Sequence, residues 1–293
     1  MKAHLKKNRS AALLLLCLVV QFCTGTLAAA TDEDKTEPQE QAEIQKKPGL
    51  FRDLWGDEKE IWTSPFRMKG KQFLTAGIVL LATGIMITQD GAIARAVMNF
   101  HDKRQWVHIT SKNLTQLGGS YAWGIAGLFA IDGLLTKDAK ARDTGIMGLE
   151  AMLHSNLLAQ FCKFVSSRER PNAGGGSNRW LGLAGIPKHF HAATDAQYSS
   201  FFSGHATTAF SLATVIASQY QDHGWVPPVC YALASLVAIS RMVENRHWCS
   251  DVFVASVVGF AIGKMVIRNH RKRRTIVPTV SLTKDRTALG FVY

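Results

Sequence analysis

The sequence contains few cysteines, and their arrangement excludes two common uses of this residue. Five occur in 293 residues, and two of these lie within the first 30 residues. The other three, Cys162, Cys230 and Cys249, are an odd number and include no pair at the short spacing of a zinc site. We therefore expect neither a disulfide framework nor a zinc centre, and we interpret the three as buried thiols.

Acidic residues are scarce outside one short segment. Ten of the 22 Asp and Glu residues lie in residues 31–60 beside only five bases, whereas residues 61–293 contain 25 bases and 12 acids. The most basic stretch, Arg268 to Arg274, has no interleaved aromatic residues and no nucleic-acid-binding motif. We therefore expect no nucleic-acid partner, and we interpret this stretch as a membrane flank or a solvated tail.

Long apolar runs are also missing. Several apolar segments have only about 15–17 residues, against the roughly 20 that a helix needs to cross a bilayer, and the mean hydropathy is +0.01. The segments are rich in Gly, Ala, Ser and Thr, as in closely packed membrane helices. We predict an all-α fold, a helical bundle of about six apolar helices embedded in a membrane, although buried helices of a soluble bundle would look similar. The segments are Phe73–Thr88, Leu114–Leu135, Thr144–Val165, Ala206–Tyr220, Val226–Ile239 and Val252–Ile267.

The N-terminal region has the layout of a targeting segment. Bases precede the apolar run Ala11–Phe22, and three alanines that end at Ala30 follow it. This order is typical of a secretory signal peptide cleaved after Ala30, and an uncleaved anchor is the alternative. The acidic stretch that comes next lacks apolar periodicity, which predicts a flexible linker. The predicted division of the chain is a signal peptide or anchor at 1–30, an acidic linker at 31–65, a helical domain at 66–270 and a basic C-terminal tail at 271–293.

Three polar clusters lie at the ends of the predicted helices. The first, KFVSSRERP, runs from Lys163 to Pro171, and the second, SFFSGH, ends in Ser203-Gly204-His205. The third, SRMVENRHWCSD, runs from Ser240 to Asp251. Each cluster is a weak signal by itself, but together they supply three cations, two histidines and one carboxylate. We therefore expect an active site at the helix ends.

The cations in these clusters suit a multiply charged oxyanion. The guanidinium groups of Arg170 and Arg241 match the geometry of phosphate oxygens, and Lys163 adds a third positive charge. Gly204 lets the backbone approach an anion closely, and the N–H groups at the start of the following helix would point at it. These residues predict a phosphate-binding site.

The histidines supply the chemistry for such a site. His247 and Asp251 are four residues apart, so on one helical turn the carboxylate would accept from one imidazole nitrogen and leave the other free as a nucleophile. His205 would protonate the leaving alcohol. Attack on phosphorus would give a phosphohistidine that water hydrolyses. This chemistry requires no metal and no cofactor.

The three clusters resemble the signature motifs of the type 2 phosphatidic acid phosphatase superfamily, which includes bacterial acid phosphatases and vanadium haloperoxidases. The resemblance spans about residues 73–267, and the first and third motifs match at every defining position. The second has Phe202 where the family usually has proline, which removes a rigid φ before the phosphate loop. The resemblance implies a metal-independent phosphatase with His247 as nucleophile, Asp251 as its partner and His205 as the acid. The phosphate ligands that it implies are Lys163, Arg170, Arg241, Ser203 and Gly204.

The predicted function is hydrolysis of a lipid-linked phosphate monoester or diphosphate at the inner membrane of a bacterial-type cell envelope. The alternatives are a broad-specificity soluble acid phosphatase of the periplasm, a vanadium haloperoxidase, and a non-catalytic membrane protein that binds lipid phosphates. The motifs do not select among phosphatidate, undecaprenyl diphosphate, phosphatidylglycerophosphate and lipid A phosphates, because all present the same group. They indicate no oligomeric state.

Charges at the helix ends predict which side of the membrane the site faces. Bases such as Arg67, Lys137 and Arg268 flank the helix ends opposite to the three motifs, so the positive-inside rule places the site on the periplasmic side. A cleaved signal peptide conflicts with this, because six spans starting outside would leave the site inside. Either one segment does not span, Leu114–Leu135 being a candidate, or the signal is not cleaved, or the chain is a periplasmic globular protein.

Other polar residues have a plain structural interpretation. Four charged residues of the motif loops are expected to be solvated, although they could touch substrate: Arg168, Glu169, Arg179 and Arg246. Glu150 and His154 are four residues apart on an otherwise apolar helix. We expect them to form a polar pair at a helix-packing interface rather than a second site.

Overall fold

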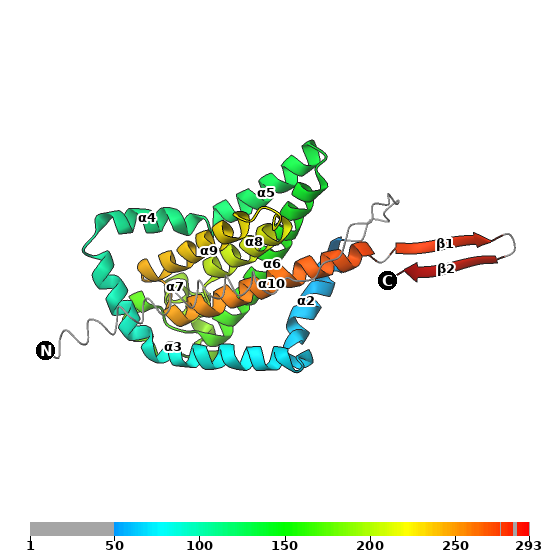
Figure 1. Ribbon diagram of the computed structural model, residues 1–293. Helices are drawn as coiled ribbons and strands as arrows, with labels where there is room; N and C mark the ends of the chain where they lie inside the picture. The colour runs from blue at the N-terminus through cyan, green and yellow to red at the C-terminus, as the bar shows by residue number, and fades with distance from the viewer. Residues whose placement is uncertain (1–49, 276, 284–285, 293) are drawn as a thin grey trace.

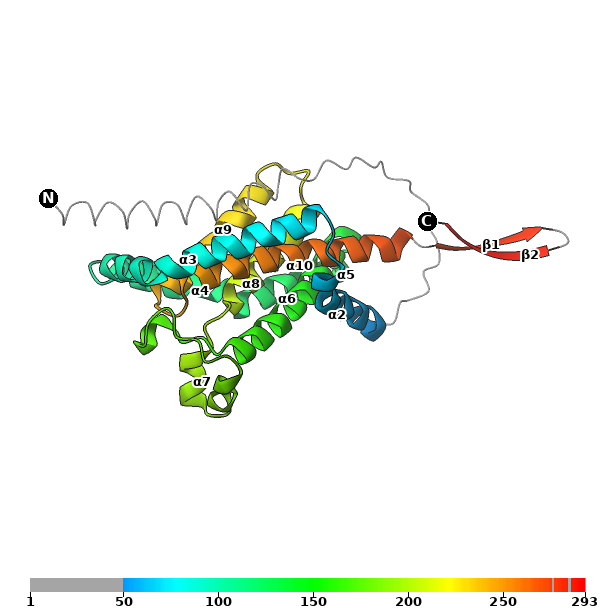
Figure 2. The same cartoon turned by 90° about the horizontal axis from the view of Figure 1, so that it is seen from below.

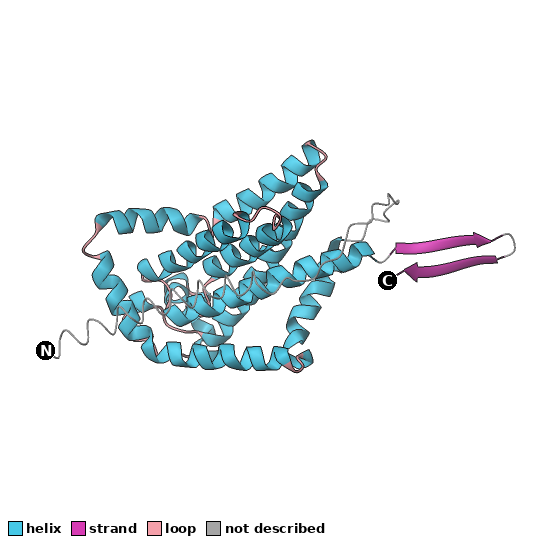
Figure 3. Cartoon of the chain, in the orientation of Figure 1, coloured by secondary structure: helices cyan, strands magenta, loops and turns pink. Residues whose placement is uncertain are grey.

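The computed structural model describes residues 50–275, 277–283 and 286–292, so the predicted signal segment and residues 31–49 of the predicted linker lie outside the described residues. The described chain is helical up to a terminal hairpin, and the all-α helical bundle that the sequence predicts is confirmed (Figures 1 and 3). The α-helices are α2 (Leu50–Arg67), α3 (Lys71–His101), α4 (Gln105–Gln116), α5 (Ser120–Leu135), α6 (Ala139–Ser166), α7 (Ala192–Tyr198), α8 (Gly204–Gln219), α9 (Val226–Val243) and α10 (Cys249–Thr275), and the 3₁₀ segments are η1 (Pro171–Ala173) and η2 (Gly182–Phe190).

The hairpin follows α10 and extends away from the bundle in both ribbon views (Figures 1 and 2). Its strands are β1 (Val277–Thr283) and β2 (Arg286–Val292), which pair antiparallel with Val280 opposite Leu289. The helix before it continues to Thr275, five residues into the predicted C-terminal tail.

The six predicted apolar segments correspond to α3, α5, α6, α8, α9 and α10, with one change of boundaries. The predicted segment Leu114–Leu135 is divided, because α4 ends at Gln116 and α5 begins at Ser120. The break contains Gly118, where an added Cβ would lie 2.6 Å from the carbonyl oxygen of His205. The chain therefore turns at a point where only a residue without a side chain can approach α8 so closely.

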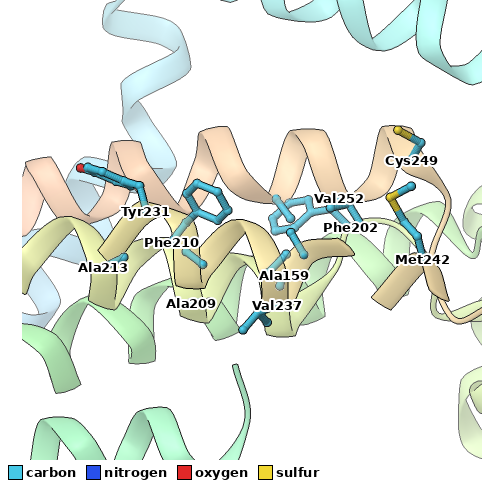
Figure 4. Close-up of a cluster of buried hydrophobic side chains, with 14 of the residues drawn as sticks. Ala159, Phe202, Ala209, Phe210, Ala213, Tyr231, Val237, Met242, Cys249 and Val252 are labelled. Atoms are coloured by element: carbon cyan, nitrogen blue, oxygen red, sulfur yellow. The ribbon is translucent and has the colours of Figure 1, made fainter. Parts of the chain in front are cut away.

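Helix α8 lies at the centre of the bundle, and its side chains form much of the hydrophobic core (Figure 4). Phe210 packs against Tyr231 of α9, with the ring centroids 6.4 Å apart. On another face, α10 approaches so closely that a Cβ at Gly259 would overlap the carbonyl oxygen of Thr207. Small residues thus bring the helix backbones together, as the composition of the segments predicts.

Helix α2 lies where the sequence predicts a flexible linker. The sequence predicts a flexible linker as far as residue 65, but the chain is helical from Leu50 and its acids are not simply solvated. Asn269 on α10 donates to Asp57 Oδ1 at 3.0 Å and to Glu60 Oε2 at 2.7 Å, and Ile61 of the same segment is buried. The acids of the segment pair with the end of α10, which is more than 200 residues away in the chain.

The chain is a membrane protein. Among the described residues, α3, α9 and α10 are long and apolar enough to cross a membrane. Apolar side chains on α3 remain exposed, including Phe73 and Leu81, and so does Leu128 on α5. An exposed apolar surface of this kind suits contact with lipid, and it does not suit the soluble periplasmic protein that the sequence leaves open as an alternative.

Candidate active site

The three predicted motifs, which are far apart in the sequence, meet at one end of the bundle. Lys163 lies in the last turn of α6, and its Nζ would be 3.3 Å from a Cβ built on Gly204 at the start of α8. The backbone N–H of Asn172 donates to the carbonyl of Asn245 at 3.2 Å, which joins the first motif loop to the third. His205 lies within electrostatic range of the three predicted phosphate-binding cations, which are Lys163, Arg170 and Arg241.

His247 is buried, and its orientation is set by a backbone group. Its Nδ1 lies 2.7 Å from the carbonyl oxygen of Ser200 and 3.9 Å from Asp251 Oδ2. The sequence predicts that Asp251 accepts directly from the imidazole, whereas in the structure the Ser200 carbonyl is the nearer acceptor and Asp251 lies at ion-pair distance. A carbonyl oxygen can only accept, so Nδ1 carries the proton and the neutral ring has its lone pair on Nε2.

The protonation state of His247 follows from its surroundings. Burial lowers the pKa of His247 to about 3, and the charges of Arg170 and Arg241 act in the same direction, against the opposing effect of Asp251. The imidazole is therefore neutral at neutral pH, which is the form that can act as a nucleophile. Burial also lowers the pKa of Arg170 to about 10, so this guanidinium stays charged at neutral pH.

Asp251 contacts the segment that orients His247. Its Oδ2 accepts from Ser200 Oγ at 2.5 Å and from the backbone N–H of Trp248 at 2.9 Å. The Trp248 contact joins the third residue of α10 to the residue before the helix, which is one half of a capping box. Asp251 thus fixes the segment whose carbonyl orients the imidazole, and its charge also acts on the imidazole directly.

Arg168 corrects the prediction of a solvated loop charge. It is fully buried, and its guanidinium donates to Asp251 Oδ1 at 2.5 Å and to Asp90 Oδ2 at 2.7 Å. The ring of Trp180 lies 4.4 Å from the guanidinium carbon. Two carboxylates that meet in a buried region need a cation between them, and Arg168 supplies it.

Asp90 is the member of this buried charge network that sequence reasoning missed. It is fully buried on α3, where it also accepts from the backbone N–H of Ser250 at 2.9 Å. The sequence feature that could have identified it is a single acidic residue within a long apolar helix. A buried carboxylate without a partner is costly, so such a residue predicts a partner elsewhere in the chain. The predicted apolar segment ended at Thr88, two residues before it.

Of the other charged loop residues that the sequence predicts to be solvated, Glu169 is buried and Arg246 is exposed. Glu169 is buried rather than solvated, because its Oε1 accepts from the backbone N–H of Gly175 at 3.0 Å and its Oε2 pairs with Arg179 at 3.1 Å. Arg246 is exposed, as expected. Phe202, which stands in place of the usual proline, is buried in the core beside the motif, and α8 still begins at Gly204.

Several buried donors at the site lack a partner in the part of the chain that the structure describes. They are Arg170 Nε, Ser203 Oγ and Arg241 Nε. Leaving a buried donor without an acceptor costs about 1–3 kcal/mol. Donors of this kind, on three motifs that meet at one place, indicate a site for an oxyanion ligand.

The predicted phosphate-binding arginines are held by neutral and acidic groups. Arg170 donates to Ser199 Oγ at 2.9 Å, and Arg241 donates to Glu244 Oε2 at 2.6 Å and to Thr115 Oγ1 at 3.1 Å. Thr115 lies on α4, a helix to which the sequence assigned no role. Its hydroxyl also contacts Ser240 Oγ at 2.8 Å, so it joins α4 to the third motif.

The Thr115→Val variant is expected to raise KM for a phosphate substrate by about tenfold with little change in kcat. A hydrogen bond to a charged group contributes about 1.5–3 kcal/mol, and a loosened Arg241 would weaken ground-state and transition-state binding alike. Steady-state kinetics checks this. Thr110→Val, at an exposed position of the same helix, is the matched control and should leave KM unchanged, whereas equal KM values for both variants would contradict the positioning role.

Comparisons with known proteins agree with the motifs. Residues 146–275 match the family model of the PAP2 superfamily, which confirms the resemblance predicted from the sequence. A protein of Porphyromonas gingivalis named Lipid A 1-phosphatase is 41% identical over 68 residues, which are 23% of this chain and 15% of that protein. This chain therefore matches only a small part of that relative's length.

Two solved structures resemble this chain. The crystal structure of Aquifex aeolicus LpxE matches 60% of this chain and 93% of its own, with 20% identity and a TM-score of 0.44. The crystal structure of the first transmembrane PAP2 type phosphatidylglycerolphosphate phosphatase from Bacillus subtilis matches 66% of this chain and 94% of its own, with 19% identity and a TM-score of 0.50. At this level of identity, the second likeness concerns the helical fold.

Proposed function

Since residues 146–275 carry the sequence pattern of the PAP2 superfamily, we propose that the protein hydrolyses a lipid-linked phosphate monoester or diphosphate through a phosphohistidine intermediate. The observation that carries this proposal is the set of buried donors without a partner in the described chain, on Arg170, Ser203 and Arg241, in the region that also holds a neutral His247. Three nearby cations would bind an oxyanion and repel a metal ion.

The first step forms a bond between His247 and phosphorus. The lone pair on Nε2 attacks the phosphorus atom, and the bond from phosphorus to the leaving oxygen breaks. Burial and the three cations lower the pKa of His205 to about 4, and the negative charge of a bound phosphate would raise it, so that the imidazole enters the step protonated. His205 gives this proton to the leaving oxygen, so the leaving group departs as a neutral alcohol or as a lipid phosphate. Lys163, Arg170 and Arg241 would hold the charge that develops on the phosphoryl oxygens.

The second step restores the enzyme. Water attacks the phosphorus of the phosphohistidine while His205, now without its proton, accepts a proton from the water. The bond from phosphorus to Nε2 breaks, and inorganic phosphate leaves. The Ser200 carbonyl, which lies 2.7 Å from Nδ1, holds the ring in the same orientation through both steps.

A lipid substrate is proposed because of where the site lies. The motif residues are at the ends of helices whose other side chains are apolar and partly exposed. A lipid in the same bilayer would therefore present its headgroup at the level of the site. The Porphyromonas gingivalis relative is named for activity on lipid A, which is consistent with a membrane-anchored phosphate ester as the substrate class.

A substrate panel tests the proposal. Purified full-length protein in detergent micelles with excess EDTA is expected to release phosphate from at least one of phosphatidate, undecaprenyl diphosphate, phosphatidylglycerophosphate and lipid A. The value of kcat/KM should exceed that for a soluble monoester by about 100-fold or more, because apolar contacts contribute to transition-state binding. Equal activity on all substrates would favour the broad-specificity acid phosphatase, and binding without turnover would favour a non-catalytic protein.

We also propose that the active site faces the periplasm. The helix ends opposite to the site carry bases, among them Arg67, Lys137 and Arg268, and basic flanks favour the cytoplasmic side. The loop between α8 and α9 belongs to that opposite end, whereas the loop between η1 and η2 belongs to the site.

Cysteine labelling checks this orientation. In intact cells, a membrane-impermeant maleimide is expected to label Asn178→Cys, in the loop near the site, and to leave Gly224→Cys unlabelled until the cells are opened. Both positions are exposed. The unmodified chain, which contains Cys162, Cys230 and Cys249, gives the background. The reverse pattern would place the site in the cytoplasm.

A further inference from the structure

A second buried polar cluster lies between α2, α6 and α10, away from the active site. It contains Asp57, Glu150 and His154, whose potential ligand atoms all lie within 4.8 Å of one another. Glu150 is 13 residues before Lys163 on α6, which corresponds to about 20 Å along the helix. The sequence suggested a polar packing pair at this place, but the structure adds an acid from another helix.

The imidazole of His154 has one nitrogen without a hydrogen-bond partner among the described residues. The residue is 1% exposed, and its Nδ1 lies 2.7 Å from Glu58 Oε1. An ionised carboxylate can only accept, so Nδ1 carries the proton and Nε2 has a lone pair. No described residue donates to Nε2. A histidine with one nitrogen fixed by a carboxylate and the other free is the arrangement that proteins use to hold a metal ligand in position.

Asp57 and Glu150 are the buried carboxylates of the cluster, and both contact the guanidinium of Arg273. Its NH2 lies 3.2 Å from Glu150 Oε1, and its NH1 lies 3.4 Å from Asp57 Oδ1. Buried carboxylates need counter-charges. Arg273 supplies one positive charge for the two carboxylates, and a divalent cation that takes its place would supply two.

We propose that Asp57, Glu150 and His154 bind a divalent transition-metal ion of the Zn²⁺ type. One imidazole and two carboxylates are ligands that Zn²⁺ accepts, with bonds of about 2.0–2.2 Å. Ligand atoms around such an ion lie roughly 3–4 Å apart, so small side-chain rotations close the cluster. The ion would join α2 to α6, and its role is structural, because the cluster is distant from the phosphate site.

Metal binding to the full-length protein tests this proposal. After chelation and removal of EDTA, the protein in detergent is expected to take up about one Zn²⁺ per chain, measured by elemental analysis after gel filtration. The melting temperature should rise by about 5 °C or more at saturating Zn²⁺, since a ligand that binds only the folded state stabilises it. Phosphate release at 25 °C is expected to stay the same with and without Zn²⁺, which separates this test from that of the proposed phosphatase activity.

Variants locate the site. His154→Gln should lose both the bound Zn²⁺ and the shift in melting temperature, and Glu58→Gln, which alters only the group behind the imidazole, should weaken Zn²⁺ binding by about tenfold or more. His223→Gln is the matched control, because this exposed histidine lies 3.7 Å from Asp222 outside the cluster. Stoichiometric binding that survives His154→Gln would overturn the proposal. So would a melting temperature that responds to pH but not to Zn²⁺, since protons would then neutralise the carboxylates.

Discussion

The His247→Ala variant is expected to lower kcat for phosphate release by about 10⁴-fold or more, because it removes the atom that forms the covalent intermediate. In the structure, Nδ1 is fixed by the Ser200 carbonyl, so Nε2 is the available nitrogen. The other groups of the site do not replace it, since Lys163, Arg170 and Arg241 are cations and the proposed role of His205 is proton transfer. The measurement is single-turnover phosphate release at saturating substrate.

The control for this variant is another histidine from the same region. His191 is exposed and lies in the loop between the first and second motifs, so His191→Ala is expected to keep kcat within about twofold of the parent. Both proteins should elute from gel filtration and melt like the parent. If the His247→Ala variant retained more than a tenth of the parent kcat, another residue would have to be the nucleophile.

The Arg168→Met variant is expected to lower the free energy of unfolding by about 3–5 kcal/mol, because it removes the only cation described between two fully buried carboxylates. Asp90 and Asp251 would then face each other without a counter-charge. Activity should also be lost, since Asp251 fixes Ser200, whose carbonyl orients His247. The measurements are the melting temperature in detergent and the rate of phosphate release.

Two further variants make this prediction specific. Lys188→Met, at an exposed position between the first and second motifs, should change the melting temperature by little. The double variant Arg168→Met with Asp90→Asn removes one of the two like charges and should recover part of the lost stability. If Arg168→Met melted like Lys188→Met, the buried charge network would not stabilise the fold.

The parts of the site that could be predicted are short motifs, in which reactive or charged side chains lie close together in the sequence. The spacing from His247 to Asp251 and the run from Lys163 to Arg170 each carry a recognisable function. The structure brings these residues together at one end of the bundle, as the order of the apolar segments implies. Their catalytic roles remain predictions until the variants are measured.

The parts that could not be predicted depend on distant partners or on backbone groups. Arg168 resembled a solvated charge because its partner Asp90 is 78 residues away, on another helix. The carbonyl of Ser200 has no signature in a sequence, since every residue has one. Helix α2 resembled a linker because Asp57 and Glu60 are polar, and only the packing against Asn269 shows that they face protein.

The most direct test of the central claim is capture of the phosphorylated enzyme. A substrate labelled with ³²P in the reacting phosphate, quenched within milliseconds in alkali, is expected to leave label on the protein that is stable in base and released in acid. Peptide mapping should place it on His247. The His205→Asn variant should gain label more slowly and keep it longer than the parent, since it lacks the group that protonates the leaving oxygen and activates water. Turnover without labelled protein in either form, or label on a residue other than His247, would contradict the phosphohistidine mechanism.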